Sequence, residues 1–361
     1  MAERVSPPDL DNPQVYEEHD PAGAYNRLFD MADQCRRAWE IAMAWSPPPL
    51  PVSPRAVVSA GMGGSAIGGD LLCALAAPLA TVPLLVQRDY GLPGYFGPHT
   101  LILACSYSGN TEETLSVAKE ARERGVPLVV ITTGGRLAEL SHEWGISPLT
   151  FVYPAQPRET LGYGLLLPLG ALTRMDLLPD LTPDVEEAIV VLERLQEEIA
   201  SSVPLARNPA KELAHWLYGC LPFVCGAGLL APVARRWKGQ FNENSKSWAV
   251  CEELPEMDHN AVAGMANPAG FARQVRAIFL TSDHDHPRNR VRQEVTRRLY
   301  EEAGTPCRTV AARGKSPLTQ VLSSALLGDA SSYYLAMLYR ADPTAIPAIK
   351  SLKEALARAP W

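Results

Sequence analysis

Three hydroxyl side chains and a glycine are concentrated between Ser106 and Thr111. Ser106, Ser108 and Thr111 flank Gly109 where an apolar run gives way to a helical pattern. Hydroxyls and backbone amides at the start of a helix can bind phosphate oxygens without a fixed cation. Capping of the helix is the competing role, and for Thr111 alone it is the more usual one. The group as a whole predicts a cup for a small phosphate dianion.

A second segment, Gly61 to Asp70, is rich in glycine and also follows a short apolar run. Gly63, Gly64 and Ser65 stand where this run enters a helix. Glycines there allow positive φ and a close approach of a ligand to the backbone, and open α/β sheets bind ligands outside the carboxyl ends of their strands. The lysine of a nucleotide P-loop is missing. We therefore expect these three residues to complete the phosphate site.

The acidic pair Glu112 and Glu113 follows the hydroxyl cup directly. Carboxylates favour a helix amino terminus, but they repel a phosphate. If the cup binds phosphate, both side chains must point away from it.

The first glycine segment also permits a dinucleotide site. Gly61, Gly63 and Ala66 fit the G-x-G-x-x-G/A fingerprint, and Asp89 follows at about the spacing of a ribose-binding acid. Such a fingerprint is weak by itself. It leaves the second cup and everything after residue 220 unexplained, so a dinucleotide-dependent oxidoreductase is the less favoured alternative.

The elements that must position these motifs alternate between short apolar strands and helices. Strands are expected at Ala56–Ala60, Val82–Val86, Leu101–Cys105, Leu128–Thr132, Leu149–Tyr153, Leu221–Cys225, Ala277–Thr281 and Cys307–Val310. Helices are expected at Ser65–Ala76, Thr111–Arg124, Arg136–Trp144, Leu161–Leu178, Pro183–Val203, from about Leu230, and at Arg288–Glu302, Leu318–Arg340 and Ile346–Arg358. This alternation predicts the α/β class with parallel sheets covered on both faces.

The chain contains a weak internal duplication. The strand–glycine–helix unit at Val57–Leu72 is similar to that at Phe223–Trp237. With 361 residues, two domains are the natural expectation. We divide the chain into residues 1–190, with a helical amino-terminal segment, and residues 191–361, with a carboxyl-terminal helix.

Composition limits the function classes. A net charge of −7 argues against a general nucleic-acid binder, which needs a basic face. Seven cysteines, an odd number without a C-x-x-C pair, fit a reducing cytoplasm. Residues 1–20 are acidic and proline-rich, unlike a signal peptide, and no apolar run of about 18 residues predicts a membrane span.

The densest chemistry lies in Arg235–Lys246 and Leu254–Asn260, where polar residues interrupt what should be a packed helix. Asn242 and Asn244 flank Glu243 and suggest a polar pocket. These stretches resemble the bifunctional phosphoglucose/phosphomannose isomerases of the sugar isomerase (SIS) superfamily. The resemblance covers most of the chain and includes Gly61–Asp70, Ser106–Thr111, Pro157-Arg158, Asn208–Lys211, Arg236–Lys238, Asn242–Asn244 and Pro255–Asn260.

This resemblance implies two SIS domains, each a parallel sheet between helices in a three-layer α-β-α sandwich. It implies a homodimer whose active site lies at the junction of subunits and domains. It implies interconversion of glucose 6-phosphate, mannose 6-phosphate or both with fructose 6-phosphate, with no metal and no cofactor. A non-catalytic regulator that binds sugar phosphates on the same fold is the alternative, although the presence of Glu243 and His259 argues against it.

Aldose–ketose isomerisation moves a proton between C1 and C2 through a cis-enediol, and one general base can perform both transfers. The resemblance implies that Glu243 is this base. It implies that His259, from the neighbouring subunit, opens the sugar ring. It implies that Arg158 stabilises the enediolate, as a cation aimed at the developing charge would.

Three further expectations concern Glu159, the carboxyl-terminal lysines and Thr344. Glu159 could pair with Arg158 and weaken its role. On the carboxyl-terminal helix the resemblance favours Lys353 as the lysine that assists ring opening, with Lys350 as the alternative. Thr344, a small residue before that helix, is expected to line the C2 side of the sugar and leave room for both epimers.

The segment Ser282–His286 has the composition of a metal site. It lies between a strand and the arginine-rich helix Arg288–Glu302. We interpret it as a polar loop with helix-capping acids and the helix as a solvated or interfacial face.

Overall fold

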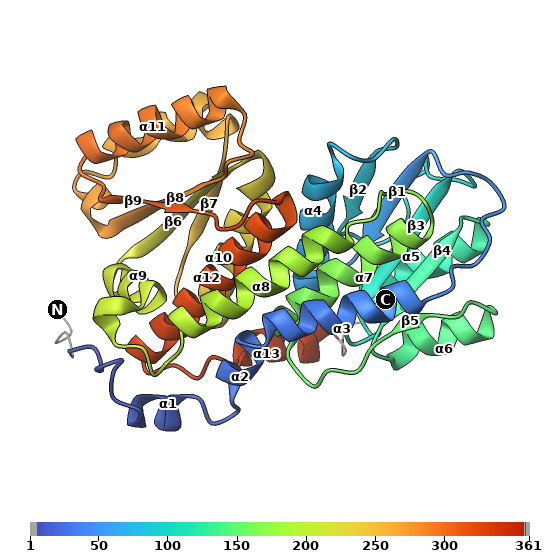
Figure 1. Ribbon diagram of the computed structural model, residues 1–361, viewed down its shortest axis with the longest axis horizontal. Helices are drawn as coiled ribbons and strands as arrows, with labels where there is room; N and C mark the ends of the chain where they lie inside the picture. Colours follow the sequence, from blue (N-terminus) through green and yellow to red (C-terminus); the bar gives the residue numbers. More distant parts are fainter. Residues whose placement is uncertain (1–5, 357, 359–361) are drawn as a thin grey trace.

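The computed structural model describes residues 6–356 and residue 358. Residues 1–5, 357 and 359–361 lie outside the described part, including the first residues of the acidic amino-terminal segment. Two parallel sheets form the framework (Figure 1). The first has the order β2-β1-β3-β4-β5, with β1 at Ala56–Ala60, β2 at Leu84–Gln87, β3 at Thr100–Ser106, β4 at Leu128–Thr132 and β5 at Leu149–Thr150. The second has the order β7-β6-β8-β9, with β6 at Leu221–Ala227, β7 at Val250–Leu254, β8 at Val275–Thr281 and β9 at Cys307–Ala311.

Helices cover both faces of each sheet. Those of the first half are α3 at Met31–Ala44, α4 at Gly63–Ala76, α5 at Glu112–Glu123, α6 at Gly135–Glu143, α7 at Leu161–Arg174 and α8 at Thr182–Glu198. Those of the second half are α9 at Pro209–Leu217, α10 at Ala231–Glu243, α11 at Pro287–Glu302, α12 at Pro317–Leu338 and α13 at Pro347–Leu356. The predicted α/β class and its three-layer arrangement are confirmed.

Alternation along the strands explains the layers. Val57 and Leu101 point into the core under α4 and α7, whereas the next residues, Val58 and Ile102, point into a separate core under α5 and α6. Successive strand residues face opposite sides of a sheet. Apolar residues on both faces therefore require helices on both faces.

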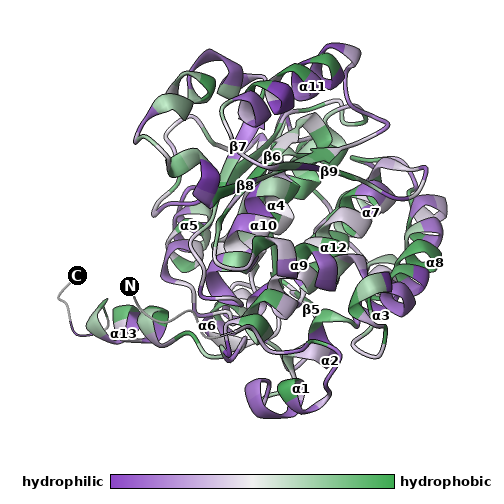
Figure 2. Ribbon diagram, turned by 90° about the vertical axis from the view of Figure 1, so that its left-hand side faces the viewer, coloured by the Kyte–Doolittle hydropathy of each residue, from purple (hydrophilic) through white to green (hydrophobic). Residues whose placement is uncertain are grey.

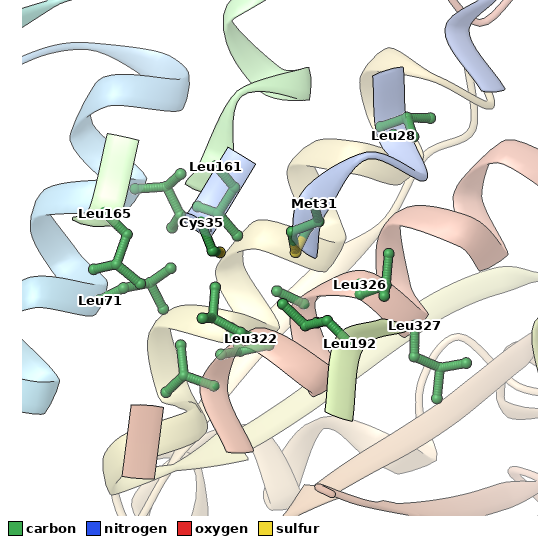
Figure 3. Close-up of a cluster of buried hydrophobic side chains, with 14 of the residues drawn as sticks. Leu28, Met31, Cys35, Leu71, Leu161, Leu165, Leu192, Leu322, Leu326 and Leu327 are labelled. Carbon is green, nitrogen blue, oxygen red and sulfur yellow. The ribbon is translucent and has the colours of Figure 1, made fainter. Parts of the chain in front are cut away.

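The two halves share one continuous core. Leu71 of α4 and Leu165 of α7 belong to the same buried cluster as Leu192 of α8 and Leu322 of α12 (Figure 3). The proposed boundary between residues 190 and 191 falls inside α8, which contacts both α3 and α12. The two halves are thus closely packed, and α8 belongs to the interface between them.

Besides β2, which lies at Leu84–Gln87 and not at Val82–Val86, two strands differ from the expectation. The strand at Leu149 stops at Thr150, because the chain then leads into the one-turn helix η1 at Pro157–Glu159. Strand β7 was not predicted. It carries Glu252 and Glu253 at the edge of the sheet, and charged residues on an edge strand hide its apolar pattern.

The amino-terminal segment packs on the second half through helices α1, Gln14–His19, and α2, Ala24–Leu28. The fully buried ammonium of Lys211 donates to the Leu10 carbonyl at 2.8 Å, to Asp11 at 3.0 Å and to the Ser201 carbonyl at 2.8 Å. Burial of a charge is tolerated when it is hydrogen-bonded in this way. Lys211 therefore anchors the segment for which the sequence suggested no role.

The last helix, α13, lies at the periphery of the molecule (Figure 2). It has no buried residue, and Leu352 is 59% exposed. Within the described residues, no helix combines the length and the apolar character needed to cross a membrane.

Candidate active site

A cavity of about 220 Å³ lies between α4 and α10, where the two halves meet. We call it the central cavity. It brings together four of the predicted site residues, Gly63, Gly64, Arg158 and Glu243. Its other lining residues are Ala66, Ile67, Arg88, Arg235, Arg236, Lys238, Gly239 and Gln240.

Arg158 is a buried cation that lines this cavity. Its side chain is 4% exposed and lies just beyond β5, on η1. Nε donates to Asn244 Oδ1 at 2.8 Å, and Nη2 donates to the carbonyls of Pro343 and Thr344 at 2.6 and 3.0 Å. Nη1 lies 3.4 Å from Glu243 Oε2. Four of its five N–H groups are thus used, and one on Nη1 has no partner among the described residues.

The asparagines beside Glu243 have separate roles. Asn244 accepts from Arg158 and donates to Ser332 of α12 at 2.9 Å, so it fixes the guanidinium against the core. Asn242 donates to the Ser247 carbonyl at 2.8 Å and fixes the turn after α10. Neither asparagine lines the central cavity, so they shape the surroundings of Glu243 and are not themselves walls of a pocket.

A buried ion pair holds the backbone of Arg158 in place. Arg236 of α10 binds Asp329 of α12 through Nε at 3.0 Å and Nη2 at 2.5 Å, and Nη2 also donates to the Arg158 carbonyl at 3.0 Å. Burial raises the pKa of Asp329, and the Arg236 guanidinium opposes this shift. Burial also lowers the pKa of Arg158, while Glu243 raises it.

Glu243 is the last residue of α10, and its side chain is 32% exposed. The carboxylate lines the central cavity beside Arg158. It is therefore neither a fully solvated surface group nor sealed in the core. A small molecule in the cavity can reach a carboxylate and a guanidinium at once.

Glu159 does not pair with Arg158. Its buried carboxylate accepts from Arg27 Nε at 2.5 Å and from Nη2 at 3.3 Å. Arg27 Nη2 also donates to Thr344 Oγ1 at 3.2 Å. The pairing of Glu159 with Arg158 that we considered from the sequence is wrong. Arg27 of α2 binds the Glu159 carboxylate instead, so Arg158 remains available to face the cavity.

The hydroxyl cup forms at the carboxyl end of β3. Ser106 Oγ donates to Thr111 Oγ1 at 2.9 Å and accepts from the Gly109 amide at 3.1 Å, while Ser108 Oγ accepts from the Asn110 amide at 3.2 Å. Gly109 has a φ of 66° and lies against Gly134, so a side chain there would clash. The Thr111 side chain makes no capping hydrogen bond to α5. The Ser106 and Thr111 hydroxyls are thus in contact with each other, and Ser108 is held by the Asn110 amide beside them.

Two further features of the cup bear on phosphate binding. Glu112 is turned away, since its carboxylate accepts from the Tyr90 hydroxyl at 3.1 Å. A small hollow of about 20 Å³ is lined by Ser65, Ser106 and also by Gly64, which lines the central cavity as well. Gly64 at the start of α4 therefore lines both this hollow and the central cavity.

The start of α4 lies tightly against η1. A Cβ on Gly64 would stand 2.6 Å from the Pro157 carbonyl oxygen, closer than any side chain tolerates. The glycine is required so that the helix terminus can approach the Arg158 loop. This packing fixes the distance between the cup and Arg158.

Thr344 and the two lysines lie outside the lining of the central cavity. Thr344 is held at its rim, with its carbonyl on Arg158 and its hydroxyl on Arg27. Lys350 and Lys353 are both exposed on α13, and the Lys350 side chain is 4.0 Å from Glu354. Within one chain, neither lysine is brought to Glu243.

His259 is also separated from Glu243 within one chain. It is exposed in the short helix η4, Glu256–His259, which follows the carboxyl end of β7. Helix α10 runs back from the carboxyl end of β6 for 13 residues, about 20 Å. Glu243 therefore lies at the amino-terminal edge of the second sheet and His259 at the opposite edge.

Several cations of the site could not be found from the sequence. Arg88 follows β2 and pairs with Asp70, which also accepts from Arg235 at 2.9 Å. Lys246 donates to the Glu243 carbonyl at 2.6 Å. The run of basic residues around Arg235 was a signal for part of this group, whereas Arg88 carries no motif at all.

The loop with a metal-like composition is structural. His286 caps α11 by accepting from the Arg288 amide at 3.1 Å, and Asp285 accepts from the Ser282 amide at 3.0 Å. The loop interpretation is supported, although the cap is a histidine and not an acid. Among the described residues no group of three or more His, Cys, Asp and Glu side chains is placed to hold a metal ion.

Comparisons with known proteins agree with this geometry. The family described as the bacterial phospho-glucose isomerase C-terminal SIS domain matches residues 206–356. A bifunctional phosphoglucose/phosphomannose isomerase from Caldicellulosiruptor bescii is 36% identical over 334 residues, which cover 92% of this chain and 98% of that protein. A protein of the same name from Aquifex aeolicus is 35% identical over 303 residues, 84% of this chain and 90% of that protein.

The fold is also found among solved structures. A hypothetical protein from Thermus thermophilus superposes with a TM-score of 0.73 at 17% identity, covering 96% of this chain and 92% of that one. The arrangement of two SIS domains expected from the resemblance is confirmed. The two relatives show that the chain belongs to the family of bifunctional phosphoglucose/phosphomannose isomerases.

Proposed function

We propose that the chain is an aldose–ketose isomerase that interconverts glucose 6-phosphate, mannose 6-phosphate or both with fructose 6-phosphate through a cis-enediol. The observation that carries the proposal is the pairing of Glu243 with Arg158 in one cavity, beside a cup of hydroxyls. The phosphorylated hexose spans these two features. The chain's own side chains supply a base, a cation and phosphate donors.

The phosphate lies in the cup formed by Ser65, Ser106, Ser108 and Thr111, against the amino termini of α4 and α5. Unpaired backbone amides and the positive end of each helix dipole favour an anion there. Gly63 and Gly64 let the phosphate oxygens approach the α4 backbone. Anchoring the phosphate leaves C1 and C2 to reach toward the central cavity, which shares Gly64 with the hollow beside the cup.

Glu243 removes the proton from one carbon and returns it to the other. Its partly exposed carboxylate can accept a proton and deliver it again on the same face of a planar enediol. The enediolate oxygen carries negative charge as the C–H bond breaks. Arg158 has one N–H directed to no acceptor among the described residues, and a preoriented donor of this kind stabilises developing charge.

Ring opening precedes the proton transfer and needs groups near the ring oxygen and O1. We assign this step to His259 and Lys353. Since His259 is exposed and lies at the opposite edge of the second sheet from Glu243, we infer that a second copy of the chain brings His259 to the cavity in a homodimer. The exposed apolar face of α13, with Ile349, Leu352 and Leu356, fits a helix covered in such an assembly.

Thr344 is assigned to the C2 side of the sugar. Its small side chain at the rim leaves room for rotation about C2–C3, which a site that accepts both C2 epimers requires. As the resemblance implies, we expect the reaction to run with neither metal nor cofactor. We place this activity in the cytoplasm and expect neither nucleic acid nor membrane as a partner.

The direct test is a coupled assay on the purified protein with fructose 6-phosphate, in the presence of EDTA. Glucose 6-phosphate and mannose 6-phosphate are scored separately. Formation of either supports the isomerase, and formation of both establishes the bifunctional activity. Bound substrate without turnover would favour the non-catalytic regulator, and a signal that depends on added NAD(P) would favour an oxidoreductase.

A further inference from the structure

Lys246, in the turn after helix α10, has an unusual backbone conformation. Its φ is 55°, and Asp176, Lys246 and Arg340 are the residues other than glycine with positive φ in the described part of the chain. A lysine there costs on the order of 1 kcal/mol and persists only where the surroundings hold it. The contacts of the Lys246 side chain explain why this backbone conformation is kept.

The side chain folds back onto the end of α10. Nζ donates to the Glu243 carbonyl at 2.6 Å and to the Asn244 carbonyl at 3.3 Å. The last carbonyls of a helix have no intrahelical donor, and a cation at this end also favours the helix dipole. The ammonium therefore holds the backbone of the residue whose carboxylate faces the cavity.

The same ammonium reaches the segment that holds Arg158. Nζ is 3.5 Å from the Pro343 carbonyl, which accepts from Arg158 Nη2 at 2.6 Å. Lys246 and Arg158 thus converge on one acceptor. The end of α10, the loop of Arg158 and the segment before Thr344 are connected through this carbonyl.

Burial, followed by the nearby charge of Arg158, lowers the pKa of Lys246 to about 8, while Asp342 and Glu243 act against the shift. On its other side the lysine borders a groove that also contains Cys220 and Tyr339. The charged form predominates below this pH and is lost above it. Any role that needs the ammonium is therefore lost as the pH rises through about 8.

We propose that Lys246 is a positioning residue that fixes the Glu243 end of α10 against the Arg158 loop through the Pro343 carbonyl. This inference rests on the proposed isomerase function. It does not place the amine on the substrate, because its donors are directed to backbone carbonyls. Displacing a reacting group by about 1 Å can cost about 100-fold in rate, so a loose helix end lowers kcat more than substrate binding.

The test compares Lys246→Met with Lys246→Arg. Methionine keeps an unbranched apolar stem but removes the ammonium, and arginine keeps a charge that does not titrate in the accessible range. With fructose 6-phosphate we expect Lys246→Met to lower kcat about 10- to 100-fold while KM changes less than about twofold. Lys246→Arg should retain most of kcat, and the alkaline fall of kcat near pH 8 should move upward by about one pH unit or more.

Lys119, an exposed lysine of α5, supplies the matched control, since Lys119→Met should leave kcat, KM and the pH profile unchanged. Thermal unfolding of each variant separates misfolding from misplacement. Inactive wild-type protein would count against the isomerase function itself. An active wild type with unaltered kcat in folded Lys246→Met would overturn the positioning role, as would a Lys246→Arg variant that behaves like Lys246→Met.

Discussion

Replacing Arg158 by lysine tests whether the site needs a guanidinium or only a positive charge. In the structure the guanidinium holds Asn244, Glu243, Pro343 and Thr344 through Nε and both terminal nitrogens. A lysine has one nitrogen and cannot span acceptors on several sides. The lysine would keep the positive charge, but no N–H would be held in the direction of the cavity.

The expected magnitude follows from two losses. Removing one preoriented donor from developing charge typically costs about 100-fold in kcat, or about 2.7 kcal/mol. Leaving at least one buried acceptor of Arg158 unpaired should also lower the free energy of unfolding by about 1–3 kcal/mol. KM for fructose 6-phosphate should change little, because the phosphate is held by the cup and not by Arg158.

Steady-state kinetics and thermal unfolding measure both effects. Arg313→Lys is the control. Arg313 is a half-exposed arginine that pairs with Glu198, and it does not line the central cavity. It should behave as the wild type, because an exposed ion pair contributes little. If folded Arg158→Lys kept kcat within about threefold of the wild type, the role assigned to the guanidinium would be refuted.

Three other changes follow from the structure. Lys211→Met should lower the free energy of unfolding by about 2 kcal/mol, because the buried Leu10 carbonyl loses a charged donor, and chemical denaturation would show no change if the contact contributed nothing. Ser106→Ala should raise KM for fructose 6-phosphate more than it lowers kcat, whereas an equal loss in both would argue against phosphate binding in the cup. Mixing inactive Glu243→Gln with inactive His259→Ala under exchange of subunits should restore about one quarter of wild-type activity if the histidine crosses a dimer interface, and none if both residues serve the same chain's site.

The fold was largely predictable because its strands are short apolar runs between helices. Each buried strand of the first sheet has apolar residues on both faces, so Leu101 and Ile102 both signal burial. Strand β7 was not predicted, because it contains Glu252 and Glu253 at a sheet edge, where charge is tolerated.

The site was predictable only where one motif carries the chemistry. Glu243 and Asn244 stand together in the sequence, and the resemblance identified them along with Arg158. The partner of Glu159 was not accessible, because Arg27 is 132 residues away and approaches only in the folded chain. The role of Lys246 depends likewise on the Pro343 carbonyl from a distant segment.

The most direct test of the central claim is isomerisation of fructose 6-phosphate in D₂O, followed by NMR of the aldose products. If the Glu243 carboxylate removes a proton from C1 of fructose 6-phosphate, that proton can exchange with D₂O before it is delivered to C2. The aldose product should therefore carry deuterium at C2. The Glu243→Gln variant, shown to be folded by its thermal unfolding, should form almost no product. Product without deuterium, together with near-normal turnover of Glu243→Gln, would contradict the assignment of Glu243 as the base.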